Sequence, residues 1–200
     1  PAIQDQLEAL EKKGVEVDIW KIRQSHKIDY LTMAWNVLML SFQKKQYDLI
    51  HAFYGHCSLV ARSQFRFPVV TTFQGTDMLG GINGVMHKKD GLIGRFAARL
   101  SKQVIVMSDE MKAASPHRET VVIPFGINTD IFYPRPLQET RTLLNLSPDS
   151  KYVLFPYHPN RSEKNYPIIE EAVKLLCQKI PNVEIIPIFA RGREEVAQYM

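Results

Sequence analysis

"VLFPYHPNRSEKNYPIIEEAVKLL" occupies residues 153–176 and changes its hydrophobic period halfway along. Its first residues form the short apolar run of a buried strand, and its last twelve have the apolar spacing of an amphipathic helix. The loop between them holds His158, Asn160, Arg161 and Lys164. A loop that follows a strand and opens a helix lies at the carboxyl edge of a sheet, where open α/β sheets bind their ligands.

The start of this helix predicts an anion site. A helix N-terminus offers backbone N–H groups and the positive end of the helix dipole. Asn165 or Tyr166 can cap the helix, with Pro167 in its first turn. Arg161 and Lys164 add two cations, so the loop suits a phosphate or a pyrophosphate. The alternative is a solvated loop whose cations serve only solubility, and the residue pattern by itself leaves both interpretations open.

Strands and helices alternate through most of the chain. Expected helices cover residues 2–13, 30–45, 55–65, 91–102, 108–115, 137–146, 168–179 and 193–200. Expected strands cover residues 15–20, 47–53, 68–73, 103–107, 120–125, 152–157 and 183–189, and a glycine-punctuated loop runs through Gly80, Gly81 and Gly84. This alternation predicts parallel sheets covered on both faces, the doubly wound α/β class.

The alternation is interrupted near Pro134 and Pro136, which predicts a domain boundary. We expect a Rossmann-like domain over residues 1–134, and a linker helix with the start of a second such domain over residues 135–200. The chain opens without Met and stops inside a helix pattern. We therefore expect a piece of a longer protein, with its first domain nearly complete (first strand missing) and its second truncated.

Composition is that of a globular protein, with 45% hydrophobic and 23% charged residues among 200. The net charge of +4 makes anionic partners plausible, but it is too small to predict nucleic-acid binding. We find neither an apolar run of membrane-spanning length nor a signal peptide pattern. Cys57 and Cys177 match no metal spacing, so buried free thiols in a reducing compartment, the cytoplasm, are expected.

Residues 87–103 predict a basic amphipathic helix. Leu92, Ile93, Phe96, Ala97 and Leu100 share one face and are flanked by Lys88, Lys89, Arg95, Arg99 and Lys102. Such a helix can lie on the cytoplasmic face of an anionic membrane as a peripheral contact. The competing interpretation is that the apolar face packs on the sheet while the cations are solvated.

The loop after residue 155 resembles the start of the second domain in retaining glycosyltransferases of the GT-B fold, the glycogen-synthase-like group that uses nucleotide-sugar donors. In that family an Arg and a Lys bind the donor diphosphate, and the resemblance gives these roles to Arg161 and Lys164. Here Lys follows Arg by three positions, whereas the family commonly has five, so Lys164 is the better match of the two.

Four further stretches resemble the same family: "QDQLEALEKKGVEVDIW" (4–20), read as its first helix and second strand, "YDLIHAFYGHCSLVA" (47–61), "PVVTTFQGTD" (68–77) and "VVIPFGINTDIFYP" (121–134). The resemblance implies a turn at Pro124 and Gly126, with Phe132 anchoring the crossing to the second domain. It also implies a sugar or acceptor cleft formed by His51, Gly55, Gln74, Gly75 and Asp77. Gln74 stands where the family usually has His; its amide can form hydrogen bonds but cannot carry a proton charge.

The resemblance implies transfer of a sugar from a nucleotide-diphosphate sugar to a glycan or a lipid-linked saccharide, with retention. It implies no metal and no other cofactor, and it assigns no catalytic residue. The family's acidic donor-binding element is expected beyond Met200, so these residues alone are expected to be inactive. Two alternatives are a nucleotide-sugar epimerase of the same fold, which calls for clustered carboxylates and histidines, and a non-enzymatic sugar-binding protein of the periplasmic type, which calls for an export signal.

Overall fold

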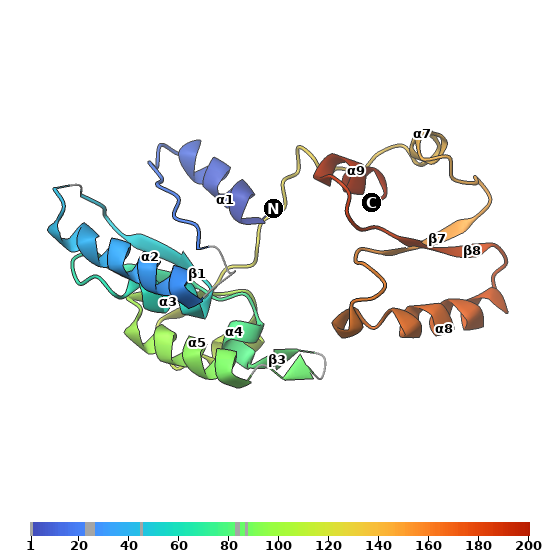
Figure 1. Cartoon of the computed structure of the whole chain (residues 1–200). Coiled ribbons are helices and arrows are strands. Elements are labelled where there is room, and N and C mark those ends of the chain that lie inside the picture. The colour runs from blue at the N-terminus through green and yellow to red at the C-terminus, as the bar shows by residue number, and fades with distance from the viewer. Residues whose placement is uncertain (1, 23–26, 45, 83–84, 87) are drawn as a thin grey trace. The chain divides into compact units, whose positions relative to one another are not determined.

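The computed structural model describes residues 2–22, 27–44, 46–82, 85–86 and 88–200 (Figure 1). The chain divides into two compact units, which we call the N-terminal unit (Pro1–Gly126) and the C-terminal unit (Ile127–Met200).

The division falls eight residues before the position expected from the sequence. The segment that follows Gly126 makes its contacts within the C-terminal unit: the guanidinium carbon of Arg193 lies 5.8 Å from the ring centroid of Phe132. Arg135 donates hydrogen bonds to the carbonyl oxygens of Ile131 and Ala197. These side-chain contacts attach the segment to the C-terminal unit. The positions of the prolines, from which the boundary was predicted, do not reveal such tertiary contacts.

The N-terminal unit is built on one parallel sheet. Its strands are β1 (Ile50–Phe53), β2 (Val69–Thr72), β5 (Gln103–Val106) and β6 (Thr120–Val122), paired in the order β1-β2-β5-β6. Each successive strand is added at the same edge, as expected when helical crossovers connect parallel neighbours. The predicted α/β class is confirmed.

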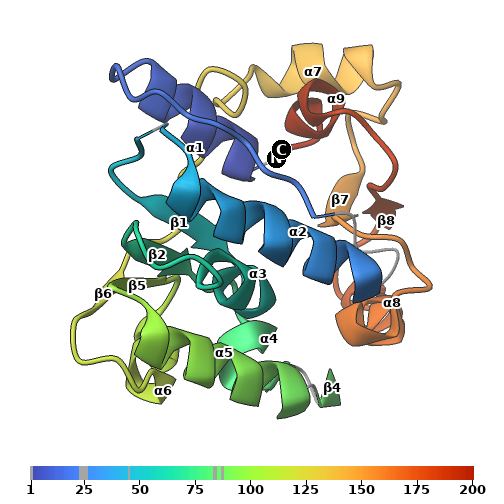
Figure 2. The ribbon, with the colours of Figure 1, turned by 60° about the vertical axis from the view of Figure 1, so that its left-hand side comes forward.

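Helices precede β1 and connect the strands that follow it. They are α1 (Ala2–Glu11), α2 (Lys27–Met39), the short 3-10 helix η1 (Leu40–Phe42), α3 (Gly55–Ala61), α4 (Thr76–Leu79), α5 (Lys88–Leu100) and α6 (Asp109–Ala114). Figure 2 shows α2, α3 and α5 on the same side of the sheet. The predicted loop after β2 instead contains α4 and a small hairpin of β3 (Gly81–Ile82) and β4 (Val85–Met86); Gly84 lies outside the described residues.

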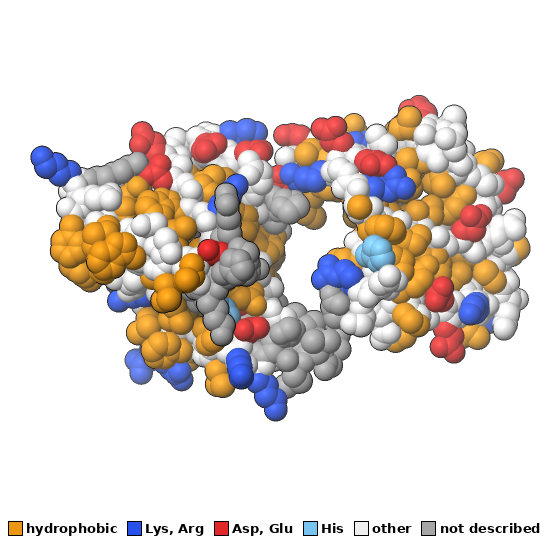
Figure 3. Space-filling model, viewed as in Figure 1, with side chains coloured by type: hydrophobic (Ala, Val, Ile, Leu, Met, Phe, Trp, Pro, Cys, Tyr) orange, Lys and Arg blue, Asp and Glu red, His pale blue; other side chains and the backbone are white. Residues whose placement is uncertain are grey.

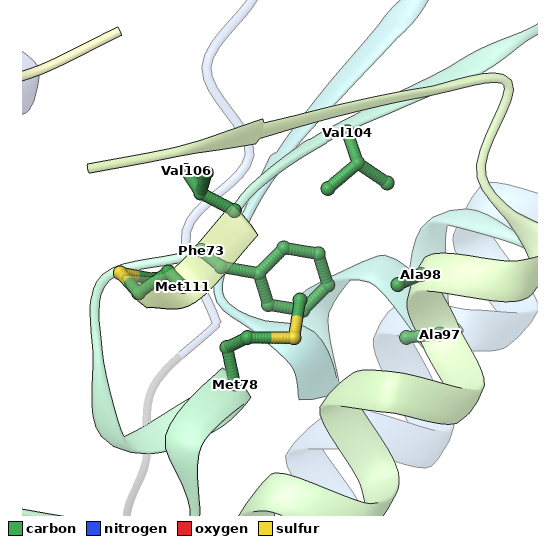
Figure 4. Close-up of a cluster of buried hydrophobic side chains, with 7 residues drawn as sticks. All are labelled: Phe73, Met78, Ala97, Ala98, Val104, Val106 and Met111. Atoms are coloured by element: carbon green, nitrogen blue, oxygen red, sulfur yellow. The ribbon is translucent and has the colours of Figure 1, made fainter. Parts of the chain in front are cut away.

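The core lies between β5, α4 and α5. Figure 4 shows the side chains that form it: Phe73, Met78, Ala97, Ala98, Val104, Val106 and Met111. Along β5, Val104 and Val106 are buried whereas Gln103 and Ile105 are partly covered. The face of the sheet that α5 covers is therefore more deeply buried than the opposite face. The run of apolar residues in this strand had predicted that both faces are covered.

Small residues on α5 permit this packing. A Cβ atom at Gly94 would stand 1.5 Å from the carbonyl oxygen of Asp77, and one at Gly91 would stand 2.6 Å from the Cα of Gly80. The helix is thus held against α4 at backbone contact distance. Its larger side chains point the other way, so Leu92, Phe96 and Leu100 are exposed. Of the apolar face expected from the sequence, Ala97 packs in the core, whereas the interpretation that Leu92, Phe96 and Leu100 also pack on the sheet is wrong, because glycine and alanine occupy the packing face.

The strand expected at residues 15–20 is absent from the structure. Helix α1 ends at Glu11 and is followed by a turn that reaches Gly14, which has φ +80°, and the chain then runs without pairing to any described strand. Val15, Ile19 and Trp20 are exposed, and Tyr47 donates a hydrogen bond of 2.6 Å to Asp18. A strand needs a partner for its backbone groups, and a local alternation of apolar residues does not supply one.

The C-terminal unit contains a two-stranded parallel sheet of β7 (Lys151–Phe155) and β8 (Val183–Pro187). Its helices are α7 (Leu137–Leu143), the 3-10 helix η2 (Ser162–Lys164), α8 (Tyr166–Cys177) and α9 (Arg193–Gln198). Cys177 is an exposed free thiol, and Cys57 in α3 is a partly buried one. The expectation that both are buried is wrong for Cys177, because it lies at the end of α8, a helix with no buried residues. Over the described residues, no helix is long and apolar enough to cross a membrane.

Candidate functional site

The carboxyl ends of β1 and β2 bring four of the predicted residues together, Gly55, Gln74, Gly75 and Asp77, whereas His51 lies earlier in β1 and contacts Thr72. The Asp77 carboxylate accepts hydrogen bonds from the backbone N–H groups of Gly55 (3.2 Å), Gln74 (2.9 Å) and Gly75 (2.9 Å). One side chain at the start of α4 therefore ties the loop after β1 to the loop after β2. This arrangement fixes the backbone at the edge of the sheet where α/β proteins bind ligands.

The backbone of these loops leaves little choice of residue. Gly75 has φ 136° and ψ −88°, a conformation available to glycine and not to residues with a Cβ. Tyr54, just before α3, has φ 79°. Gly55 lies against α5, where a Cβ atom would stand 2.8 Å from the Cα of Gly94. The close approach of α5 and the Asp77 hydrogen bonds therefore hold the loops together.

Within this cluster the side chains differ in what they can offer a ligand. Asp77 is fully buried, with both oxygens occupied by the loops, so in this structure it positions backbone rather than touching a ligand. Gln74, two residues after the end of β2, is exposed. His51 is partly buried: its Nε2 lies 2.7 Å from the Thr72 hydroxyl, and its ring stacks on Phe53 at 4.4 Å. Gln74 is therefore the predicted cleft residue most available to a sugar.

Burial also sets the protonation of these groups. Burial lowers the pKa of His51, so its imidazole is neutral at pH 7 and serves as a hydrogen-bonding group. Burial raises the pKa of Asp77, while the backbone N–H groups of Gln74, Gly75 and Gly55 act in the opposite direction. Burial raises the pKa of the Cys57 thiol, and the nearby Asp77 charge adds to this rise, so Cys57 is a poor thiolate nucleophile.

The second cluster lies where β7 passes into α8. The Lys164 ammonium nitrogen lies 4.1 Å from the ring centroid of Tyr157, and the Arg161 guanidinium carbon lies 5.4 Å from the same centroid. Next to it, the ring of His158 packs on Phe189 with centroids 4.5 Å apart, and its Nδ1 accepts a hydrogen bond from the N–H of Asn160. The structure thus gathers both predicted diphosphate-binding cations on one aromatic ring.

The backbone at this junction differs from the expected cap. Asn165 occupies the N-cap position in the left-handed conformation (φ 54°, ψ 50°), but its side chain makes no capping hydrogen bond. Pro167 has no N–H, and the N–H of Ile168 donates to the carbonyl oxygen of Asn165. Fewer backbone donors face the loop than the helix start suggested. The cationic side chains therefore carry more of the attraction for an anion.

The predicted turn at Pro124 and Gly126 lies further along the chain. Residues 123–128 run without a turn, and a Cβ atom at Gly126 would meet nothing within 4 Å. The chain turns where the N–H of Phe132 donates to the carbonyl oxygen of Asn128, whose side chain also accepts from the N–H of Asp130. The reason is local: Asn128 forms a side-chain-to-backbone turn that proline and glycine do not form here.

Sequence reasoning missed Tyr157. It stands two residues after the end of β7, within a loop whose His, Arg and Lys residues gave the stronger signal. An aromatic residue just before two cations in the same loop is the pattern that could have revealed it, because aromatic rings attract ammonium and guanidinium groups. Among the described residues, no three His, Cys, Asp or Glu side chains are grouped so that they could hold a metal ion. The expectation that no metal is needed stays a prediction.

A model of the family described as Glycosyltransferase Family 4 matches residues 4–131. The chain belongs to that family. No curated protein matches the sequence.

Among solved structures, the chain is similar to sucrose-phosphate synthase from Thermosynechococcus elongatus, with 20% identity over 90% of this chain and 54% of that chain, and a TM-score of 0.59. A glycosyltransferase from Rickettsia africae matches with 15% identity over 96% and 59% of the chains and a TM-score of 0.50. A UDP-N-acetylglucosamine 2-epimerase matches with 13% identity over 100% and 55% and a TM-score of 0.47. The chain spans a little over half the length of these structures, and at these identities the first two support the two-domain α/β fold alone.

Proposed function

We propose that the protein transfers a sugar from a nucleotide-diphosphate sugar to a saccharide acceptor, a glycan or a lipid-linked saccharide, and that it retains the configuration of the transferred sugar. The family membership supports glycosyl transfer as the reaction class. The observation that carries the proposal is the pairing of Arg161 and Lys164 on one ring, at the start of α8 and the carboxyl end of β7.

The chemistry of the reaction explains why cations belong there. Glycosyl transfer passes through an oxocarbenium-like transition state, as glycoside hydrolysis does. Negative charge grows on the departing diphosphate as the bond to the sugar breaks. Cations already held in place stabilise that charge more in the transition state than in the ground state, which is the requirement for raising the rate. Lys164 and Arg161 provide two such cations from the protein alone.

The N-terminal unit would supply the acceptor side. The Asp77 hydrogen bonds fix the loops after β1 and β2, and Gln74 is exposed at their edge. A fixed loop holds an amide side chain in one place, and an amide can both donate to and accept from sugar hydroxyls. Gln74 would therefore orient a sugar and leave proton transfer to another group.

Calorimetric titration with nucleoside diphosphates tests the donor site. UDP, ADP and GDP are titrated in turn into the parent protein, into Lys164→Ala and into the control Lys174→Ala, which removes an exposed cation further along α8. We expect Lys164→Ala to weaken binding of the preferred diphosphate by roughly 1.5–3 kcal/mol, as for a charge-assisted contact. The control should match the parent. Equal affinities for all three proteins would remove Lys164 from the site.

A further inference from the structure

The N-terminal unit has an exposed face that combines apolar and cationic side chains. Helix α2 presents Ile28, Leu31 and Trp35 with exposed fractions of 68%, 70% and 62%. These positions, spaced three and four residues apart, lie along one side of the helix. Its other side is the packed one, because Val37 is buried and the carbonyl oxygen of Ala34 accepts a hydrogen bond from Ser63 after α3.

Two aromatic rings extend this apolar strip beyond the end of α2. Phe42 in η1 and Phe65 after α3 are 70% and 71% exposed, and they contact each other edge-on with centroids 5.9 Å apart. Figure 3 shows hydrophobic side chains (orange) gathered at the left-hand edge of the N-terminal unit, with Lys and Arg side chains (blue) below them. Exposed cations Lys44, Arg62 and Arg66 are close in sequence to the two rings.

Helix α5 continues the surface on the same side of the sheet (Figure 2). Glycine and alanine occupy its packing face, so Leu92 and Phe96 are exposed beside Lys88, Lys89 and Arg99. We call the exposed apolar and basic residues of α2, η1 and α5, together with those in the segments just after η1, α3 and α5, the docking face. Its members are Ile28, Leu31, Trp35, Phe42, Lys44, Arg62, Phe65, Arg66, Lys88, Lys89, Leu92, Phe96, Arg99, Leu100 and Lys102.

Positive charge is concentrated in the segments that form this face. Residues 27–44, 55–66 and 88–102 contain nine Lys or Arg and two Asp, whereas the rest of the chain contains sixteen Lys or Arg and nineteen Asp or Glu. The mild net charge of the chain therefore conceals a strongly basic region and an acidic remainder. A basic region attracts an anionic surface, and it does so less as salt is added.

We propose that the docking face binds an anionic lipid surface, with Trp35, Phe42, Phe65 and Phe96 entering the headgroup boundary and the flanking cations contacting lipid phosphates. The contact differs from a membrane span, since it lies in the plane of the interface. It includes α2 and η1, which the sequence pattern of residues 87–103 did not suggest.

The composition of the face favours lipid over a second copy of the chain. The core of a protein–protein interface is depleted of charge, whereas here Lys88 and Arg99 alternate with Leu92 and Phe96 on one side of α5. Two copies packed through this face would also bring two cationic surfaces together, which costs free energy. Aromatic rings bordered by Lys and Arg are typical of membrane–water interfaces.

Vesicle co-sedimentation tests the proposal without any nucleotide, so its outcome is separate from diphosphate binding. The protein is mixed with vesicles of phosphatidylglycerol and phosphatidylcholine, or of phosphatidylcholine alone, at low and at high salt. We expect sedimentation with the anionic vesicles at low salt, weaker sedimentation at high salt, and none with phosphatidylcholine alone.

Two sets of variants separate the apolar and the cationic contributions. The double variant Lys88→Ser, Lys89→Ser should lower the partition coefficient ~10-fold or more at low salt and reduce its salt dependence. Trp35→Ser with Phe42→Ser should lower it at both salt concentrations. Matched controls are Lys174→Ser with Lys179→Ser for charge, and Leu137→Ser with Leu143→Ser for exposed apolar area, all in the C-terminal unit.

Three results would overturn the proposal. The first is no sedimentation with anionic vesicles at low salt, and the second is an equal loss of vesicle binding in the control variants. The third is a concentration-dependent dimer in analytical ultracentrifugation that Trp35→Ser abolishes, in a protein that does not bind vesicles. All substituted side chains are exposed, so unchanged melting temperatures are expected and rule out misfolding as the cause of a loss.

Discussion

The ammonium of Lys164 lies 4.1 Å from the ring centroid of Tyr157, and the guanidinium of Arg161 approaches the same ring. A cation over an aromatic face is held by the ring's quadrupole. Tyr157 therefore keeps two long side chains near the start of α8 before any anion arrives, which lowers the entropy lost on binding.

Tyr157→Ala should weaken nucleoside diphosphate binding by about 0.5–1 kcal/mol, because the cations lose the ring that holds them. Tyr157→Phe keeps the ring, so its binding free energy should lie within a few tenths of a kcal/mol of the parent value. Calorimetry with the preferred diphosphate makes the comparison. Equal weakening in both variants would assign the effect to the hydroxyl group and remove the ring from the explanation.

Gln74→Ala tests the sugar or acceptor cleft. Loss of one sugar hydrogen bond should lower kcat about three- to tenfold, with little change in diphosphate affinity, because the two sites lie in different units. The assay is release of nucleoside diphosphate from a nucleotide sugar. If Gln74→Ala and Gln74→His both turn over at the parent rate, the position serves only the scaffold.

Two glycines give a matched pair for the packing of α5. Gly94→Ala would place a methyl group 1.5 Å from the carbonyl oxygen of Asp77, so the backbone must move, and we expect a loss of about 3 kcal/mol or more in the free energy of unfolding. Gly126→Ala meets nothing within 4 Å and should stabilise the protein by about 0.4–1 kcal/mol through the unfolded chain. Urea denaturation measures both. Similar values for the two variants would contradict the close contact of α4 with α5.

His51 should make stability depend on pH. Its folded pKa lies below the ordinary value because of burial, so the folded protein resists protonation and the unfolded chain does not. The resulting stability is complete above the unfolded pKa of about 6.5 and declines as the pH falls below it.

We therefore expect the loss of unfolding free energy between pH 7.5 and pH 5 to be smaller in His51→Gln than in the parent. His158→Gln, which changes an exposed histidine in the other unit, is the control. An identical pH profile for His51→Gln and the parent would show that His51 protonates as easily in the folded protein as in the unfolded chain.

The sequence predicted those elements whose determinants are local. Helix α8 and strand β5 lie within a few residues of their expected ends, because apolar period and flanking turn residues specify them. The proximity of Gly55, Gln74, Gly75 and Asp77 follows from the topology of a parallel sheet, since consecutive strands end at the same edge; their role at a sugar or acceptor cleft stays a prediction.

Where the prediction failed, the deciding contact was not local. Residues 15–20 have a strand pattern but lack a strand to pair with. Leu92 and Phe96 have the apolar spacing of a core face, yet Gly91 and Gly94 take that position because only they permit backbone contact with α4. No pattern within a single helix distinguishes these two faces. The ring of Tyr157 likewise gains its role from two cations that follow it in the chain, Arg161 and Lys164.

The central claim is that the junction of β7 and α8 binds a nucleoside diphosphate. Amide chemical-shift mapping of the isotopically labelled protein during titration with that diphosphate tests it most directly. The account predicts that the largest shifts fall within residues 157–168 and disappear in the double variant Arg161→Ala, Lys164→Ala. Shifts confined to other segments, or shifts at this junction that persist in the double variant, would contradict it.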